Sequence, residues 1–295
     1  MRELLNQEGC EEKRMLYRQL GKTGVKIPVM GQGTWKFGEN EQTEKEEIEA
    51  LRYGIANGMT LIDTAEEYAN GRSERLVAQA IDGVRNEVFL VTKVSSKNCS
   101  FDGVIWAVEA SLNRLNTNYI DLYLQHWPSQ QYELAETMEA MVKLVKEGLI
   151  KYVGVSNFSI ELMQEAQKCL GSIPLVCNQV GYHLNDRRIE DHLLPYCNEN
   201  GITVMGYSPF GYAPQVFGMP GFPVSGTEER NLLDELGIKY EKTAYQIALN
   251  WVLRQENIVT IPKAVNMKHM ENNLHALGWV IDKEDLDLID RYFPK

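Results

Sequence analysis

The chain has 295 residues, of which 44% are apolar, so it is long enough to bury a large core. No run of about 18 apolar residues occurs in it, which argues against a membrane-spanning helix. The formal net charge of -11 argues against nucleic acid or an anionic membrane as the main partner, and we expect a soluble cytoplasmic protein.

The first segment, residues 1–16, is charged and lacks the apolar core of a signal peptide. We interpret it as an N-terminal extension ahead of a single domain over residues 17–295. Two short strands, Tyr17–Leu20 and Val25–Pro28, flank Gly21-Lys22-Thr23-Gly24, which predicts a β-hairpin. We expect the hairpin to cover the bottom of the domain that follows.

Short apolar runs alternate with stretches of helical periodicity from about residue 29 to residue 278. This alternation indicates parallel strands joined by right-handed crossovers, and eight repeats favour a closed (β/α)8 TIM barrel over an open sheet. The predicted strands are Val29–Gly33, Thr60–Asp63, Val88–Lys93, Ile120–His126, Tyr152–Asn157, Leu175–Val180, Thr203–Ser208 and Val259–Lys263. The predicted helices include Glu44–Asn57, Val104–Leu115, Leu134–Glu147, Ile160–Leu170 and Thr243–Arg254.

The longest interruption of this pattern runs from Phe210 to about Glu228 and is rich in glycine, proline and aromatic residues. Loops of this length are often functional lids, and the alternative is a solvated connection without a role. Leu232–Leu236 predicts a short extra helix, and Lys283–Tyr292 predicts the last helix. The expected fold is therefore an α/β barrel with an N-terminal hairpin and two extra helices.

Ionisable residues close three consecutive predicted strands: Asp63, Lys93 and His126, with Tyr68 in the loop after Asp63. The carboxyl ends of barrel strands face one mouth, so we expect these side chains to meet there. A neighbouring cation lowers the pKa of a phenol from about 10 toward neutrality, which would make Tyr68 a general acid. Each residue alone could be structural, but three such strand ends are costly unless the groups pair or function.

Two other chemistries find less support in the sequence. The remaining histidines are spread over other elements, and there is no CxxC, so no metal site is expected. Val153-Gly154-Val155-Ser156-Asn157 resembles a serine nucleophile elbow but lacks its final glycine. A metal-dependent barrel hydrolase stays open as a weaker alternative.

A set of motifs resembles the aldo-keto reductase family from about Tyr17 to Phe293. The resemblance implies NAD(P)H-dependent reduction of aldehydes or ketones to alcohols, with Tyr68 as proton donor and His126 orienting the carbonyl group. The alternative is a reductase-fold regulatory or cofactor-sensing module with little turnover. The motifs are Gly31-Gln-Gly-Thr-Trp35, Asp63-Thr-Ala-Glu-Glu-Tyr68, Thr92-Lys93, Asp121-Leu-Tyr-Leu-Gln-His-Trp-Pro128, Gly154-Val-Ser-Asn-Phe158, Asn178-Gln179, Tyr207-Ser-Pro209 and Ile261-Pro-Lys-Ala264.

The resemblance also implies positions at the nicotinamide end of the cofactor. Ser156, Asn157 and Gln179 match residues that hold the carboxamide, which needs both donors and acceptors. Tyr207 matches the ring that stacks on the nicotinamide, and Ser208 opens the loop along the pyrophosphate.

At the adenosine end, Lys263 matches a phosphate-binding lysine and Asn273 an adenine-contacting asparagine. His269 stands where an arginine often grips the 2′-phosphate, and losing the arginine fork weakens bidentate recognition. We therefore expect NADPH as the cofactor, with NADH also possible.

Trp35 and Trp127 match aromatic pocket walls of the family. The chain stops at Phe293-Pro294-Lys295, without the long C-terminal loop of members with narrow specificity. We expect an open pocket, a broad range of small carbonyl substrates, and a monomer or weak dimer.

Overall fold

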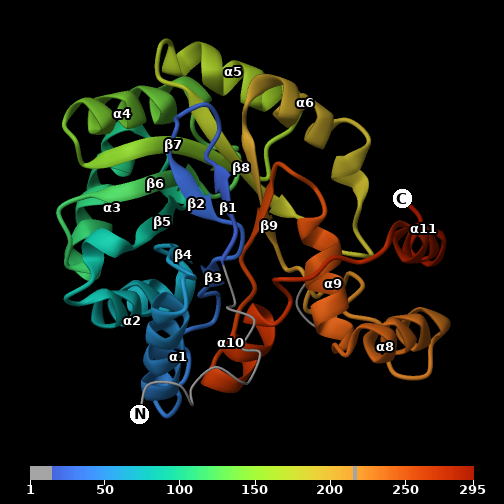
Figure 1. Ribbon diagram of the computed structural model, residues 1–295. Coiled ribbons are helices and arrows are strands. Elements are labelled where there is room, and N and C mark those ends of the chain that lie inside the picture. Colours follow the sequence, from blue (N-terminus) through green and yellow to red (C-terminus); the bar gives the residue numbers. More distant parts are fainter. Residues whose placement is uncertain (1–14, 215–217) are drawn as a thin grey trace, which may run out of the picture.

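The computed structural model describes residues 15–214 and 218–295. Its main sheet contains β3 (Gln32–Gly33), β4 (Leu61–Asp63), β5 (Phe89–Val94), β6 (Ile120–Gln125), β7 (Ile150–Ser156), β8 (Leu175–Gly181), β9 (Thr203–Tyr207) and β10 (Ile258–Thr260). These eight strands are parallel and pair in chain order, with helices packed around them (Figure 1). The predicted (β/α)8 architecture is confirmed.

Backbone contacts between the first and last strands close the barrel. Gly31 N donates to Thr260 O at 2.8 Å, and Thr260 N donates to Val29 O at 2.9 Å. The regular part of β3 is shorter than the predicted strand Val29–Gly33, and Met30 forms only an isolated bridge with Thr260. The chain passes very close to β4 here, because a Cβ at position 31 would lie 2.6 Å from Leu61 Cγ. Only glycine fits that approach.

The helices that follow the strands form because their apolar residues recur on one face. In α3 (Phe101–Leu115), Val104, Ala107, Val108 and Leu115 are buried, and the Ser100 side chain accepts from Gly103 N. The others are α1 (Glu44–Ala56), α2 (Arg72–Ile81), α4 (Leu134–Lys146), α5 (Ile160–Leu170), α6 (Leu193–Asn200), α9 (Ala244–Leu253) and α10 (Met267–Leu274). The first turns of α3, α5, α9 and α10 are also capped by a side chain. Among the described residues, no helix is long and apolar enough to cross a membrane.

Two further helices correspond to the predicted extra elements. α11 (Lys283–Tyr292) has the predicted bounds, and α8 (Glu228–Tyr240) extends well beyond the predicted Leu232–Leu236. The longer α8 begins at its cap, where the Thr227 side chain accepts from Arg230 N, and ends at Glu241, which adopts a left-handed conformation. Caps at both ends let the helix continue over polar, exposed turns that carry little apolar signal.

The N-terminal hairpin, β1 (Tyr17–Gln19) and β2 (Lys26–Pro28), covers the amino end of the barrel, as predicted. Leu20 and Ile27 are fully buried in the cluster of apolar side chains from the strands. Gly21 N donates to Thr203 Oγ1 at 2.8 Å at the start of β9. The opposite mouth is left free for the site. Of the predicted extension over residues 1–16, residues 1–14 lie outside the described part.

The long connection between β9 and α8 packs on neighbouring elements at the mouth. Phe222 stacks on Tyr245 of α9 with ring centroids 4.3 Å apart. Tyr212 donates to Asp186 Oδ2 at 2.8 Å, and Asn185 Nδ2 donates to the backbone O of Gly221 at 2.9 Å. Residues 215–217 of this loop lie outside the described residues. Its role as a lid stays a prediction.

Candidate active site

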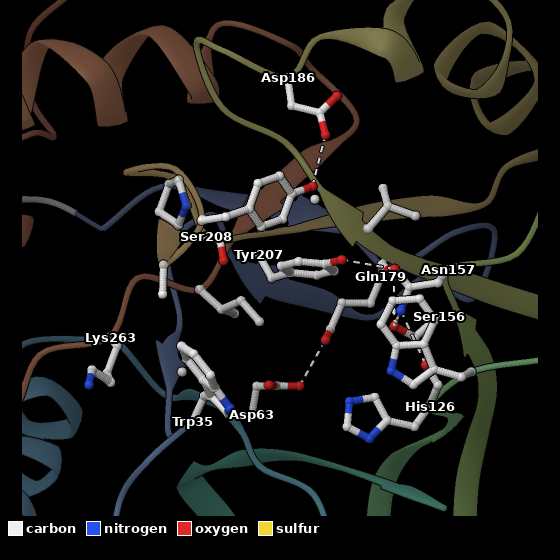
Figure 2. A pocket seen from close by; sticks show the side chains of 18 of the residues that line it. Trp35, Asp63, His126, Ser156, Asn157, Gln179, Asp186, Tyr207, Ser208 and Lys263 are labelled. Carbon is white, nitrogen blue, oxygen red and sulfur yellow. Dashed lines mark hydrogen bonds between the residues drawn. The ribbon is translucent and has the colours of Figure 1, made fainter. Parts of the chain in front are cut away.

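A cavity of about 990 Å³ opens at the carboxyl ends of the strands (Figure 2). Lys93 is fully buried behind it, and two other predicted site residues, His269 and Asn273, lie on α10 outside its lining. Most of the predicted site residues line it: Trp35, Asp63, Tyr68, His126, Trp127, Ser156, Asn157, Gln179, Tyr207, Ser208 and Lys263.

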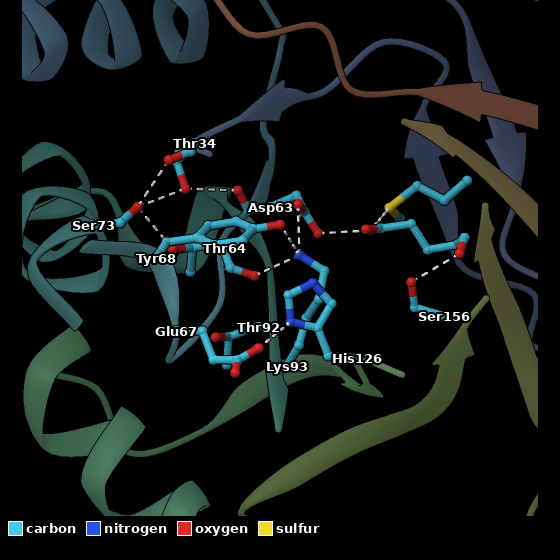
Figure 3. Close-up of polar contacts among 12 residues, drawn as sticks. Thr34, Asp63, Thr64, Glu67, Tyr68, Ser73, Thr92, Lys93, His126 and Ser156 are labelled. Atoms are coloured by element: carbon cyan, nitrogen blue, oxygen red, sulfur yellow. Dashed lines mark hydrogen bonds and ion pairs between the residues drawn. The ribbon is translucent and has the colours of Figure 1, made fainter. Parts of the chain in front are cut away.

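A buried ion pair lies under the cavity and touches the phenol. Lys93 Nζ donates to Asp63 Oδ2 at 2.8 Å, to the backbone O of Thr64 at 2.8 Å and to Tyr68 OH at 3.2 Å (Figure 3). Gln179 Nε2 donates to the other Asp63 oxygen at 2.7 Å. β4 and β5 pair in parallel, which brings Asp63 and Lys93 together at neighbouring strand ends. Each of the three N–H groups of the Lys93 ammonium therefore has an acceptor, which fixes the ammonium in one place.

The charges of this group differ in one respect from the sequence-based expectation. Burial lowers the pKa of Lys93, but Asp63 and then Tyr68 raise it by more, so the ammonium form is favoured. Burial also raises the pKa of Tyr68 above its ordinary value, and the opposing influence of Lys93 is smaller. Lys93 does lower the pKa of Tyr68, but the expectation of a net shift toward neutrality is wrong for this site. Desolvation outweighs the neighbouring cation, and Tyr68 keeps its proton at neutral pH.

His126 faces Tyr68 across the cavity floor, with ring centroids 5.7 Å apart in an edge-on arrangement. Burial lowers the pKa of His126, and contact with Glu67 opposes that effect. Its Nδ1 lies 3.3 Å from Glu67 Oε2, a contact outside hydrogen-bond geometry. Glu67 did not figure among the predicted site residues. Its place directly before Tyr68 was the signal that could have identified it.

The residues predicted to bind the carboxamide and to stack on the nicotinamide lie together at the carboxyl ends of β7, β8 and β9. Ser156 Oγ donates to the backbone O of Gln179 at 2.9 Å, and Tyr207 OH donates to Asn157 Oδ1 at 2.9 Å. Asn157 Nδ2 donates to Ser156 Oγ at 3.0 Å. Asn157 and Ser208 both adopt positive φ values, 62° and 53°, directly after their strands. Such backbone strain in non-glycine residues is concentrated at functional sites.

Two lysines mark the other end of the cavity. Lys36, which was not among the predicted residues, and Lys263 both line it. Partial burial first, and then repulsion from Lys36, lower the pKa of Lys263. Neighbouring cations that repel one another are stabilised by an anion between them, so this end suits a phosphate or pyrophosphate.

A bound dinucleotide would also satisfy a donor of α10. Asn273 is 5% exposed, and its Nδ2 is buried without a hydrogen-bond partner. Unpaired buried donors are uncommon in folded proteins, and the nitrogens of an adenine ring are acceptors. His269 is exposed on the same helix. The residues present thus fit a nicotinamide dinucleotide that reaches from the barrel mouth toward α10.

The barrel mouth thus holds a phenol against a buried ion pair at one end of its cavity and two neighbouring lysines at the other. A sequence model of the aldo/keto reductase family matches residues 29–293. The methylglyoxal reductase YeaE of Escherichia coli strain K12 is 40% identical over 270 residues, covering 92% of each chain.

Solved structures agree with the sequence match. The thermostable aldo-keto reductase Tm1743, in complex with the inhibitor epalrestat, superposes with a TM-score of 0.85 at 39% identity, covering 94% of this chain and 99% of that one. An aldo/keto reductase from Klebsiella pneumoniae, in complex with NADP and acetate, gives a TM-score of 0.85 at 38% identity, covering 95% and 96% of the two chains.

The chain belongs to the aldo/keto reductase family. The predicted family is thereby confirmed, and with it the predicted function in NADP-dependent carbonyl reduction.

Proposed function

We propose that this chain reduces small aldehydes and ketones to alcohols with NADPH, with Tyr68 as the proton donor. The observation that carries the assignment is the contact of Lys93 Nζ with Tyr68 OH at 3.2 Å, made while the same ammonium pairs with Asp63 at 2.8 Å. The phenol is therefore tied to a buried charge pair at the cavity floor. A substrate oxygen beside it would meet a positioned proton donor.

The protein's own residues carry the proton chemistry. NADPH, when bound, supplies a hydride to the carbonyl carbon. Tyr68 gives its phenolic proton to the carbonyl oxygen, and the ammonium of Lys93 stabilises the phenolate that remains. Asp63 keeps Lys93 charged, and Gln179 holds Asp63 in place through its 2.7 Å bond. Solvent from the open cavity returns the proton to Tyr68.

The cofactor would be held along the cavity by residues with separate tasks. Ser156, Asn157 and Gln179 would bind the carboxamide, and Tyr207 would stack on the nicotinamide ring. Ser208 and Lys263 would hold the phosphates, and Asn273 the adenine. His269 would face the 2′-phosphate region with a single ring in place of an arginine fork, so NADH remains a second possible cofactor.

The substrates would be small and of broad range, 2-oxoaldehydes such as methylglyoxal included. The related E. coli chain is named a methylglyoxal reductase, which supports this class. Trp35 and Trp127 line the cavity and would form its aromatic walls. Trp127 is 45% exposed to solvent. A wall open to solvent leaves room for substrates of different length. The protein would act in the cytoplasm as a monomer or weak dimer.

Initial rates with a panel of carbonyl compounds test the assignment. Methylglyoxal, glyceraldehyde and 4-nitrobenzaldehyde would each be offered with NADPH and with NADH, and cofactor oxidation followed at 340 nm. We expect turnover of all three, with higher kcat/KM for NADPH. Binding of NADPH without turnover of any carbonyl compound would instead indicate a cofactor-sensing module.

A further inference from the structure

A carboxylate that was not among the predicted site residues faces the buried Nδ1 of the His126 ring. Glu67 Oε2 lies 3.3 Å from Nδ1 (Figure 3). Nδ1 is buried and has no hydrogen bond of standard geometry, so a small rotation of either side chain would complete one. Ser95 Oγ donates to the other Glu67 oxygen at 2.8 Å and anchors the carboxylate. The residues that make this contact follow three different strands, β4, β5 and β6, and Ser95 holds the Glu67 carboxylate in place.

The other groups around the ring do not offer Nδ1 an acceptor. Asn157 Nδ2 donates to the backbone O of His126 at 3.2 Å and leaves the ring nitrogens alone. Lys93 is a cation and cannot accept a proton. The charged and titratable groups that act on the pair are Asp63 from β4, Tyr68 after it, Lys93 from β5 and Lys97 after β5, the last of which acts on Glu67.

A neutral imidazole carries its proton on one nitrogen and a lone pair on the other. A lone pair on Nδ1 would face the Glu67 carboxylate and stay buried without a donor. A proton on Nδ1 faces that carboxylate favourably. We propose that Glu67 is a positioning residue that fixes the ring proton of His126 on Nδ1, so that Nε2 donates to a substrate oxygen only when the ring is an imidazolium.

The ionisation states agree with this arrangement. Contact with His126 lowers the pKa of Glu67, which keeps it a carboxylate while the ring titrates. Burial lowers the pKa of His126, Glu67 raises it, and Lys93 lowers it further, with a net decrease. At neutral pH the ring is therefore uncharged, and Tyr68 is the donor to the carbonyl oxygen. As pH falls through the His126 pKa, the imidazolium adds a second donor at Nε2.

The position of the His126 ring proton can be measured directly by 15N NMR of the full chain labelled at histidine, without substrate or cofactor. His126→Gln identifies the signal by its loss. We expect the neutral ring to carry its proton on Nδ1, and a proton on Nε2 would overturn the proposal. This measurement does not depend on turnover. The inference about substrate rests on the proposed function, which NADPH oxidation at a single pH tests separately.

The matched variant is Glu67→Gln, whose amide can accept from or donate to Nδ1. Both tautomers should then appear at neutral pH, and the midpoint of ring titration should move to lower pH. In the parent, kcat/KM should rise by roughly tenfold as pH falls through that midpoint, because a charge-assisted hydrogen bond is added. In Glu67→Gln this rise should shrink and move to lower pH.

Glu199→Gln serves as the control, because it removes the same charge from an exposed position of α6 that does not line the cavity. Its tautomer, midpoint and pH profile should match the parent. A profile and NMR signal of Glu67→Gln that equal those of the parent would overturn the proposal. So would a Glu199→Gln variant that reproduces the Glu67→Gln shift, since net charge alone would then explain it.

Discussion

Replacing Lys93 by methionine should both destabilise the protein and stop catalysis. Methionine has a similar length but no charge, so Asp63, which is 2% exposed, would keep Gln179 and lose its cation. Removing one partner of a buried ion pair costs about 3–5 kcal/mol. For a chain of 295 residues that free energy corresponds to a fall in Tm of roughly 5–8 °C.

Thermal unfolding followed by circular dichroism measures the effect, and a double-mutant cycle isolates it. Lys93→Met and Asp63→Asn should each lower the free energy of unfolding, and the double variant should be more stable than their sum predicts by about 0.5–3 kcal/mol. Lys151→Met is the control, because its 2.9 Å bond to Asp121 involves a side chain that is 47% exposed. That variant should change stability by about 1 kcal/mol or less.

The reasoning would be refuted by additive effects in the cycle, or by a Lys93→Met variant as stable as the parent. Either result would mean that the buried pair is not coupled. Loss of activity should accompany the loss of stability, by about 10²-fold or more, because the phenolate of Tyr68 would lose its cation.

Two further predictions concern the cofactor and the proton donor. His269→Arg should lower KM for NADPH by about tenfold and leave KM for NADH unchanged, because the guanidinium adds a charged hydrogen bond to the 2′-phosphate. Equal changes for both cofactors would contradict that placement. The raised pKa of Tyr68 keeps its proton on to higher pH, so kcat/KM for reduction should be flat from neutral pH to about pH 9 and fall only above it. A loss of kcat/KM with its midpoint near pH 7 would show that Lys93 outweighs burial in setting the pKa of Tyr68.

Much of the fold was predictable because its signals are local. Glycines and polar residues end each apolar run, and helix periodicity lies between them, so the strand order and the placement of Asp63, Lys93 and His126 at one mouth follow directly. The bounds of β3 were not predictable, since they depend on how closely Gly31 approaches Leu61 across the barrel. Contacts between elements that are distant in sequence cannot be predicted from the residues of one apolar run.

The site shows the same division. Residue types at and just after the strand ends were enough to predict the buried ion pair and the phenol beside it. The direction of the Tyr68 pKa was not, because it depends on how much solvent the loop and the barrel floor exclude. Lys36 and Glu67 were missed for a similar reason: each lies beside a recognised residue, and only the three-dimensional arrangement shows that it faces Lys263 or His126.

The most direct test of the central claim is the Tyr68→Phe variant, assayed for NADPH oxidation with methylglyoxal and, separately, for NADPH binding by the change in cofactor fluorescence. The substitution removes the OH that contacts Lys93 and keeps the aromatic ring that packs against His126. We predict that turnover falls by about 10²-fold or more while the Kd for NADPH stays within about threefold of the parent. Turnover that persists at the parent's rate would contradict the assignment of Tyr68 as the proton donor.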